Sequence, residues 1–399
     1  MTRFSPLARQ RRGASSSAPG ATASSGATAP AALALLLALL LVAPTLEARA
    51  QVSTTAVPFL MIEPDSRAAG MGNTGVALAD NANAIWWNPA GLAYQRGAEV
   101  GITHTNWLAG LGDTDLYFDY LVGKYHADGI GTFGGQVAFM NLGEHERRDA
   151  QNQPVGKFRS FDLAAGVSYG RQLGERFAVG GGARYIYSKL TGSGGGTNAL
   201  DGTASSFGVD LAGMYRTRPF MLGGTETTVS FGANLSNMGP TIDYDARSDD
   251  VDPLPQHLRF GAASTFAFDE YNELTVAVDF GKMLTNVETT EVPVEDGDDD
   301  NTQPDTTTQR SVDPFYEAIV SSWAPNNKIG PDGEITGEIG TFQQLTVGAG
   351  LEYWYSQLFA LRTGYYYEDP DFGARQFLNF GAGLRYNIIG VDFSYIYPL

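Results

Sequence analysis

The chain has 399 residues, with 26 Lys and Arg against 44 Asp and Glu, a formal net charge of −18 and no cysteine. Phosphate recognition calls for clustered Lys and Arg, so this acidic balance argues against a nucleic-acid-binding protein. Without cysteine the chain forms neither a disulfide framework nor a thiolate metal site.

Residues 1–50 have the order of a secretory signal peptide. A basic start with four Arg precedes the uninterrupted apolar run of residues 31–43, and Ala48-Arg49-Ala50 is a small-x-small cleavage site. The apolar run is shorter than the roughly 20 residues that a membrane-spanning helix needs. We therefore expect export by the Sec route and a mature chain that begins near Gln51, with 21 basic against 43 acidic residues.

Residues 51–97 do not alternate between apolar and polar positions, and their small residues and glycines are typical of short helices and tight turns. The segment ends in DNANAIWWNPAGLAY, which sets two adjacent Trp against an Asn-Pro-Ala-Gly turn. In the barrel that the later strands predict, we expect this segment to lie at the periplasmic end of the lumen. The candidate residues of its motif are Trp86, Trp87, Asn88, Pro89, Ala90 and Gly91.

From residue 98 onward, segments of about ten residues alternate between apolar and polar positions. Their length is near the roughly 9–11 residues of a tilted membrane strand, and no apolar run after residue 50 approaches the length of a helical span. The thirteen predicted strands are 98–105, 113–125, 130–140, 161–171, 176–188, 206–216, 225–236, 257–268, 272–282, 341–354, 358–367, 376–386 and 389–397.

Charged residues in these strands fall on the phase opposite the bulky apolar residues. In residues 161–169, for example, Phe161 and Val167 oppose Asp162. In residues 113–125 the same pattern predicts that Phe118 and Tyr120 face outward. Asp115 and Asp119 are predicted to face the lumen. The charges predicted to face the lumen are Asp115, Asp119, Asp162, Arg184, Asp210, Arg259, Asp279, Glu352, Arg362, Arg385 and Asp392.

A soluble β-sandwich would also alternate, because its apolar phase lies inside. Here, however, the apolar phase is heavily aromatic near strand ends, as the girdles of membrane barrels are, and the other phase mixes Gly, Ala and Ser with charges of both signs. An Arg or Lys on the lipid side costs about 2–4 kcal/mol at mid-membrane. We therefore expect an all-β protein whose residues 98–399 form a transmembrane antiparallel β-barrel in the outer membrane.

The links between strands support this fold. Short links follow even-numbered strands and long ones follow odd-numbered strands, which is the asymmetry of outer-membrane barrels with long outward loops. Bacterial single-chain barrels use an even number of strands, so about fourteen are expected. Either an early strand is missing from the thirteen predicted, or the closing strand is absent from this chain, and we favour the second.

The longest link, at about 283–340, is a predicted acidic extracellular loop. Its residues 294–305 carry carboxylates at near-alternate positions, yet lack the Glu that completes an EF-hand, so a solvated disordered loop competes with calcium or cargo contact. The glycines at 192–198 lack a P-loop Lys. His104, His126, His145 and His257 have no metal-site spacing, and we predict neither a metal nor a cofactor.

The run from Phe59 to Tyr94, with Asn88-Pro89-Ala90-Gly91 before the first strand, resembles the FadL-type transporter superfamily, whose barrels carry an N-terminal hatch. The resemblance implies that residues 51–97 form such a hatch, in which Trp86 and Trp87 fill the bore and the turn directs the chain into the wall. PDSRAAGMGNTGVALADN, WWNPAGLAY and FRSFDLAAGVSYGRQLGERFAVGGGARYIYSKL are more narrowly similar to the PorV family of the type IX secretion system. That similarity covers about residues 55–190 well. The long acidic insert departs from the family pattern.

The resemblance implies a function without catalysis. PorV-like barrels bind exported cargo through its C-terminal β-domain after it leaves the translocon barrel, and pass it to the surface sortase complex, within outer-membrane lipid and lipopolysaccharide. Two alternatives stay open: a FadL-type transporter of hydrophobic solutes and a lipid A deacylase. The mixed-charge inner phase disfavours the first, and the absence of a Gly-x-Ser-x-Gly motif disfavours the second.

Overall fold

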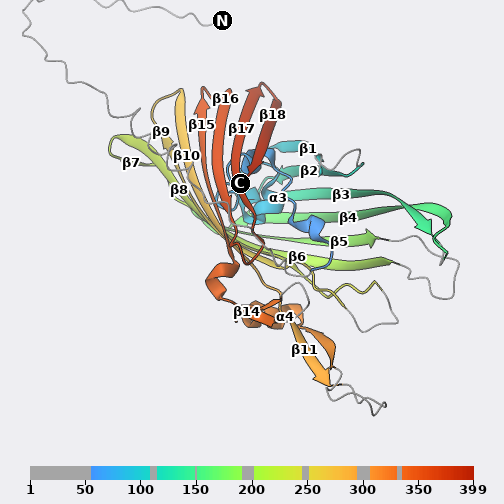
Figure 1. Cartoon of the computed structure of the whole chain (residues 1–399). Helices are drawn as coiled ribbons and strands as arrows, with labels where there is room; N and C mark the ends of the chain where they lie inside the picture. Colours follow the sequence, from blue (N-terminus) through green and yellow to red (C-terminus); the bar gives the residue numbers. More distant parts are fainter. Residues whose placement is uncertain are drawn as a thin grey trace, which may run out of the picture. The chain divides into compact units, whose positions relative to one another are not determined.

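Antiparallel strands make up most of the described residues in the computed structural model (Figure 1). The structure describes residues 55–107, 115–148, 151–190, 202–244, 251–293, 306–329 and 335–399, so the predicted signal peptide lies outside it. The main strands are β1 (Ala98–Asn106), β2 (Tyr117–Ala127), β3 (Gly131–Arg148), β4 (Pro154–Gln172), β5 (Phe177–Lys189), β6 (Thr203–Arg216), β8 (Thr225–Met238), β9 (His257–Ala267), β10 (Asn272–Met283), β15 (Leu345–Tyr355), β16 (Phe359–Tyr367), β17 (Gln376–Tyr386) and β18 (Ile389–Pro398).

These strands form one sheet in chain order, from β1 to β18, and the short β7 (Phe220–Leu222) pairs with β8. Each predicted strand therefore corresponds to one observed strand, and each pairs antiparallel with its neighbours in the sequence. The register shifts within the β3–β4 and β6–β8 pairs and is regular in the other pairs of this order. Ala98 lies opposite Tyr125 at one end of the first pair and Phe377 opposite Pro398 in the last. The alternating pattern thus predicted the all-β antiparallel fold correctly.

One predicted long link is mostly strand. Residues 141–160 were expected to be an outward loop, but β3 and β4 continue through most of it as a hairpin in which Glu144 lies opposite Arg159 and Glu146 opposite Lys157. Lys157 Nζ donates to Glu144 Oε1 at 2.6 Å. Opposite charges directly across two strands support pairing even where the apolar alternation has ended.

The insert between β10 and β15 has secondary structure of its own. Its described parts contain β11 (Val287–Pro293) paired with β12 (Thr306–Val312), α4 (Phe315–Ser321), β13 (Asn326–Ile329) paired with β14 (Ile335–Ile339), and η3 (Thr341–Gln344). The described parts of the predicted acidic loop at 283–340 thus contain two short hairpins and a helix, while its extracellular position stays a prediction. The carboxylate-rich stretch 294–305 lies outside the described residues.

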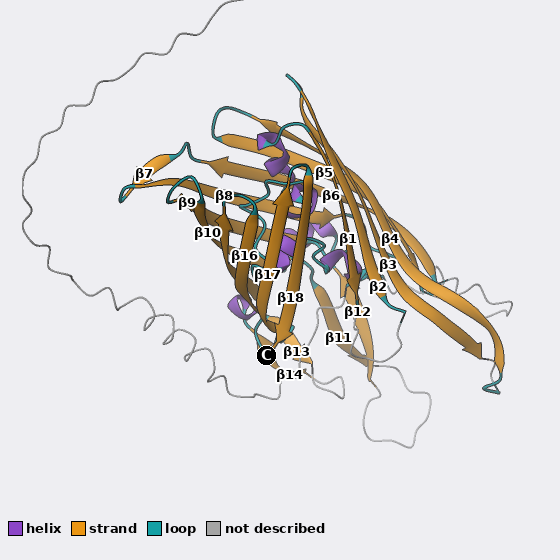
Figure 2. Ribbon diagram, turned by 90° about the horizontal axis from the view of Figure 1, so that it is seen from above, coloured by secondary structure: helices purple, strands orange, loops and turns teal. Residues whose placement is uncertain are grey.

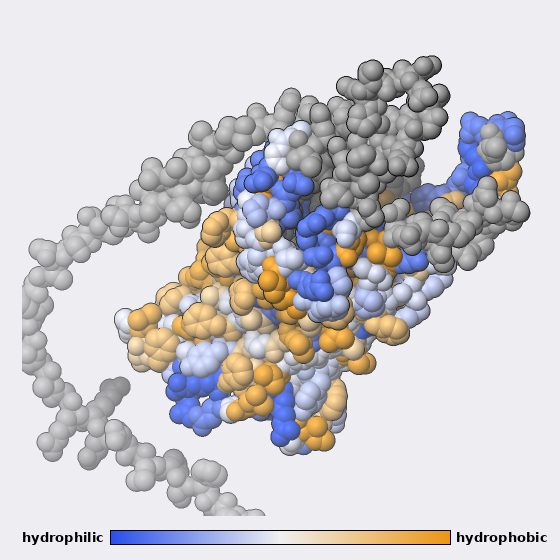
Figure 3. All heavy atoms as spheres, turned by 90° about the horizontal axis from the view of Figure 1, so that it is seen from below, coloured by the Kyte–Doolittle hydropathy of each residue, from blue (hydrophilic) through white to orange (hydrophobic). Residues whose placement is uncertain are grey.

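The two faces of the sheet differ in the way expected of a membrane barrel. Large apolar side chains point outward into exposed positions, as with Val167, Phe207, Leu211 and Phe393, which are 58–69% exposed. Their neighbours along the strands, such as Ser168, Asp210 and Asn234, are buried on the other face. Figure 3 shows large apolar areas, interrupted by hydrophilic side chains, on the side seen from below. Among the described residues, no helix is long and apolar enough to cross a membrane.

Four short turns of helix precede β1: η1 (Pro58–Met61), α2 (Ser66–Ala69), α3 (Ala84–Trp87) and η2 (Pro89–Tyr94). They lie within the curve of the sheet (Figure 2). Helix η2 packs on β3 to β6, and α2 packs on β17 and β18. The main apolar core lies between these turns and the sheet, and we call the face that they cover the inner face.

Candidate functional site

The two adjacent Trp are buried where the N-terminal segment meets the inner face of the sheet, with Trp86 3% and Trp87 2% exposed. Trp86 meets Tyr120 edge to face, with 6.0 Å between ring centroids. The Arg184 guanidinium lies 5.8 Å from the centre of the Trp86 ring, and that of Arg259 lies 5.6 Å from the Trp87 ring. The indole rings therefore fill space and also give two buried cations a favourable π surface.

The Asn-Pro-Ala-Gly turn is fixed by hydrogen bonds of Asn88, which is fully buried. Its Nδ2 donates to the carbonyls of Val76 at 2.9 Å and Gly213 at 3.1 Å, and its Oδ1 accepts from the Ala90 amide at 3.1 Å. One side chain thus joins two parts of the segment to β6 and begins η2.

Glycines on the inner face let the segment approach the wall. A Cβ at Gly180 of β5 would overlap the backbone of Pro89 and Ala90, and one at Gly364 of β16 would overlap Met71 and Gly72. Close packing of backbone on backbone leaves no volume for a side chain at these positions. The small residues of the inner phase are therefore explained by the segment that covers them.

Polar side chains of the wall bind the backbone of the segment. Asp279 Oδ2 accepts from the amides of Gly75 at 2.7 Å and Val76 at 2.9 Å. Asn234 Nδ2 donates to the Trp87 carbonyl at 3.0 Å, and Asn379 Nδ2 donates to the Ala69 carbonyl at 2.7 Å. These bonds satisfy buried backbone groups that short helices leave without partners.

A chain of ion pairs links α2 to the last strands of the sheet. Arg67 contacts Asp80 and donates from Nε and Nη2 to Glu352 at 2.8 and 2.6 Å. Glu352 also accepts from Arg362 at 2.6 Å, and Arg362 donates to Asp392 at 2.7 Å. Arg385 donates to the other oxygen of Asp392 at 2.6 Å, so the chain extends from the segment to β18.

Nine charges named from the sequence are on the face that the segment covers. A second buried pair joins Arg184 to Asp210, and Ser188 donates to Asp162 at 2.5 Å. The seven fully buried residues are Asp162, Arg184, Asp210, Arg259, Asp279, Glu352 and Arg362, and Arg385 and Asp392 are half-buried.

The prediction for β2 has the wrong phase. Phe118, Tyr120 and Val122 are 0–2% exposed and belong to the core beneath the segment. Asp119 instead lies on the outer face beside His104, with 2.7 Å between Oδ1 and Nδ1 and both side chains about half exposed. Asp115 precedes β2 and is exposed. The N-terminal segment presents apolar side chains to β2, so the inner face of β2 is apolar. The polar residue Asp119 therefore lies on the outer face, opposite to the arrangement in the other strands.

Several residues of this interface were not predicted from the sequence, among them Asp65 and Arg67. Asp65 caps α2 by accepting from the Arg67 amide at 3.0 Å and is 6% exposed. Burial raises the pKa of Asp65 to about 6, against the opposing charge and amide of Arg67. The Asp-Ser-Arg-Ala-Ala stretch could have predicted the start of α2, because Asp is a favoured N-cap residue. It could not have predicted the partner of Arg67, Glu352, which lies 285 residues later in the chain.

The four His residues lie apart in the fold. His126 hydrogen-bonds Thr132 at 2.9 Å, and His257 is buried at the start of β9. Within the described part of the chain, no three His, Asp or Glu side chains are grouped so that they could hold a metal ion.

Three solved structures are similar to this chain at low identity. The Pseudomonas putida toluene transporter TodX is 14% identical, with 82% of this chain and 91% of that one covered and a TM-score of 0.42. The CymD monoaromatic hydrocarbon channel is 14% identical, with 84% and 91% covered and a TM-score of 0.43. A Pseudomonas aeruginosa FadL homologue is 12% identical, with 83% and 89% covered and a TM-score of 0.37. TM-scores below 0.5 decide nothing about this chain.

A family model gives a firmer result. No curated protein matches the chain. The model of the type IX secretion system protein PorV matches residues 45–290, more than half of the chain. The match spans the N-terminal segment with its Trp pair and Asn-Pro-Ala-Gly turn, and the strands from β1 to β10. The chain therefore belongs to the PorV family of type IX secretion system proteins.

Proposed function

We propose that this protein is an outer-membrane shuttle of the type IX secretion system. It binds exported proteins through their C-terminal β-domain, receives them from the translocon barrel and passes them to the surface sortase complex. Membership of the PorV family supports a place in this secretion system. The finer steps are inferred from the resemblance of the N-terminal segment and first strands to PorV-like barrels.

The N-terminal segment carries this proposal, because it occupies the inner side of the sheet. It packs on β3 to β6 and on β17 and β18, and the pocket beside Arg67, Asp80 and Trp87 holds only about 10 Å³. That volume is at the lower limit for a single water molecule. A segment packed in this way favours a protein that works through its outer surfaces over a solute channel through its interior.

The proposal assigns a role to each part of the chain. Residues 1–50 direct Sec export, residues 51–97 form the hatch, and the remainder forms the outer-membrane barrel. The buried charges on the inner face line the lumen, where they pair with one another and with the hatch. Pairing of this kind satisfies charges that would otherwise be costly in a desolvated interior.

The insert between β10 and β15 carries exposed apolar residues, and we propose that these residues contact the cargo. Five apolar residues around α4 and η3 are exposed, with Tyr316 60%, Val320 76% and Phe342 87% accessible. Thr341 Oγ1 donates to the Trp323 carbonyl at 2.7 Å, which holds η3 beside the end of α4. We call Phe315, Tyr316, Val320, Trp323 and Phe342 the insert patch. Apolar side chains grouped on a loop surface are typical of a protein-binding site.

Affinity capture of the tagged protein from native outer membranes tests the shuttle role. We expect exported proteins that share a C-terminal β-domain in the eluate, and we expect those proteins to be missing from the cell surface in a deletion strain. Normal surface display in that strain would reject the shuttle, and normal display with impaired uptake of hydrophobic solutes would favour a transporter.

A set of matched variants tests the insert patch. Tyr316→Ser, Val320→Ser and Phe342→Ser together should reduce captured cargo at least tenfold. The control replaces the exposed apolar residues Phe220, Met221 and Leu222 of β7 by Ser and should leave capture unchanged. Equal capture by both variants would remove the insert patch from the proposal while leaving the shuttle role to the deletion test.

A further inference from the structure

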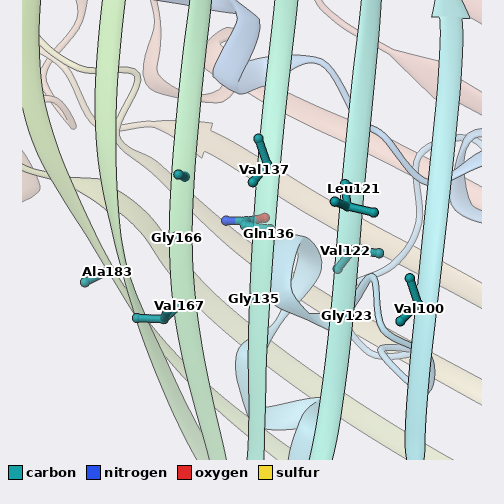
Figure 4. A pocket seen from close by; sticks show the side chains of 11 residues that line it. Val100, Leu121, Val122, Gly123, Gly135, Gln136, Val137, Gly166, Val167 and Ala183 are labelled. Atoms are coloured by element: carbon teal, nitrogen blue, oxygen red, sulfur yellow. The ribbon is translucent and has the colours of Figure 1, made fainter.

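An apolar trough of about 570 Å³ lies on the outer wall across β1 to β5 (Figure 4). Its lining includes Val100, Leu121, Gly123, Gly135, Val137 and Val167. The register explains its shape, because Val100, Gly123, Gly135, Val167 and Ala183 are successive cross-strand partners and form one row. The two glycines in the middle of this row have no side chains, so the surface is hollowed there between the larger side chains of Val100, Val167, Leu121 and Val137.

The side chains around the trough belong to the outer face. Val100 is 78% exposed, Val167 68% and Leu121 49%. Gln136 borders the trough, but its side chain accepts from the buried Tyr120 hydroxyl at 2.7 Å and so belongs to the inner face. The side chains that line the trough from the outer face are therefore all apolar.

The fold itself does not require the two glycines. Their backbone φ values lie outside the left-handed region, and a Cβ at Gly123 would meet its nearest atom at 3.6 Å and one at Gly135 at 3.9 Å. Both distances are ordinary contacts, unlike the overlaps at Gly180 and Gly364. Glycine weakens a strand and often marks a place where a ligand approaches closely. The missing side chains thus serve to keep the trough open.

The next outer row toward the short turns is aromatic. Tyr125, Phe133 and Tyr169 are cross-strand partners, and the Tyr169 hydroxyl donates to the Ile130 carbonyl in the β2–β3 turn at 2.5 Å. Aromatic rings with a polar end lie at the level of lipid headgroups in membrane barrels. The trough therefore begins where the hydrocarbon of the bilayer begins.

We propose that this trough binds one acyl chain of a membrane lipid. The inference rests on the outer-membrane placement, and it is continuous with the apolar wall that faces the bilayer. An extended peptide in the trough would leave its backbone polar groups unpaired in hydrocarbon. A helix of about 10–12 Å diameter is too wide, because the flanking rows are roughly 13 Å apart along the strand before their side chains are counted. An acyl chain has neither problem, and the volume falls within the ~300–1,000 Å³ of ligand-sized sites.

Native mass spectrometry of the purified full chain tests this site with a defined phosphatidylethanolamine that carries 16-carbon chains. The wild type should retain one lipid per chain, and the trough-filling variant Gly123→Leu/Gly135→Leu should retain at least tenfold less. The control Gly213→Leu/Ala382→Leu adds the same side chains elsewhere on the outer wall, where Gly213 has only Phe177 within ordinary contact. It should retain lipid as the wild type does.

Heat-modifiable electrophoretic mobility shows that each variant still forms a barrel. Equal lipid retention by the filled variant and the control would overturn the proposal, as would a wild type that retains no lipid. If the filled variant keeps its lipid but no longer captures secretion partners, the trough contacts another protein and not an acyl chain, and the proposal is overturned. Because lipid retention is measured on the isolated protein, its failure is distinguishable from failure of the shuttle role.

Discussion

Removal of the Arg67 side chain should release the N-terminal segment from the wall. In the variant Arg67→Met, Glu352 loses two hydrogen bonds, of 2.8 and 2.6 Å, and keeps only Arg362 as its charged partner. The Glu352 side chain is fully buried and that of Arg67 is 13% exposed. Breaking a buried ion pair from one side costs about 3–5 kcal/mol. Because Arg362 remains, we expect the lower end, about 3 kcal/mol.

Hydrogen–deuterium exchange measures this loss locally. The amides of Ala69 and Gly70 donate within α2 to Asp65 and Ser66 at 2.8 and 3.1 Å, so they report opening of the segment. A loss of about 3 kcal/mol in opening free energy corresponds to roughly 100-fold faster exchange. Strand amides of β5 should be unchanged.

The control is Arg218→Met, which removes the Arg218–Glu175 pair, where both side chains are at least 62% exposed. An exposed pair is worth about 0–1 kcal/mol, so exchange in α2 should stay as in the wild type. Unchanged exchange of α2 in Arg67→Met, or equal acceleration in both variants, would refute the view that Arg67 fastens the segment.

Three more changes test other parts of the account. Burial raises the pKa of Asp65 to about 6, above the roughly 3.9 of an unfolded Asp, so the stability gained from the protonated form is complete below about pH 3.9 and is lost as the pH rises through 6. The variant Asp65→Asn keeps an oxygen that can cap α2. It should leave the free energy of unfolding unchanged at pH 3.5 and raise it by up to about 3 kcal/mol at pH 7.5. Urea unfolding at the two pH values measures this difference, and an equal effect at both would contradict the raised pKa of Asp65. Trp86→Ala empties a site that is 3% exposed and should lower the free energy of unfolding by about 3–5 kcal/mol, whereas a change below 1 kcal/mol would show that the ring is not packed as described. Leu211→Arg places a charge on the outer face and should cost about 2–4 kcal/mol in unfolding from liposomes, and a neutral result would place Leu211 away from the hydrocarbon.

The strands were predictable because alternation and turn residues are local signals. Phe161, Leu163 and Val167 alternate with Asp162 whatever lies elsewhere in the chain, and the pairing of sequence neighbours follows. The phase of β2 was not predictable in this way. Tyr120 is buried against Trp86, and Phe118 belongs to the same core beneath the segment. Alternation alone does not tell an apolar inner face from an apolar outer face.

The contacts of the N-terminal segment depend on residues far apart in the sequence. Asp279 binds amides 203 and 204 residues earlier in the chain, and Asn379 binds a carbonyl 310 residues earlier. A single sequence shows the Trp pair and the Asn-Pro-Ala-Gly turn but not the side chains that receive them. The β11–β12 hairpin of the insert was missed because its charged, Thr-rich strands lack apolar alternation.

Site-directed fluorescence along β6 tests the orientation of the wall most directly. The chain has no cysteine, so a single Cys can be placed in turn at Ser206, Phe207, Gly208, Val209, Asp210 and Leu211 and labelled with bimane. In bilayers with bromine-labelled acyl chains, we expect strong quenching at Phe207, Val209 and Leu211 and weak quenching at Ser206, Gly208 and Asp210. Uniform quenching along the strand, or quenching by aqueous iodide at Val209, would show that this wall does not face lipid.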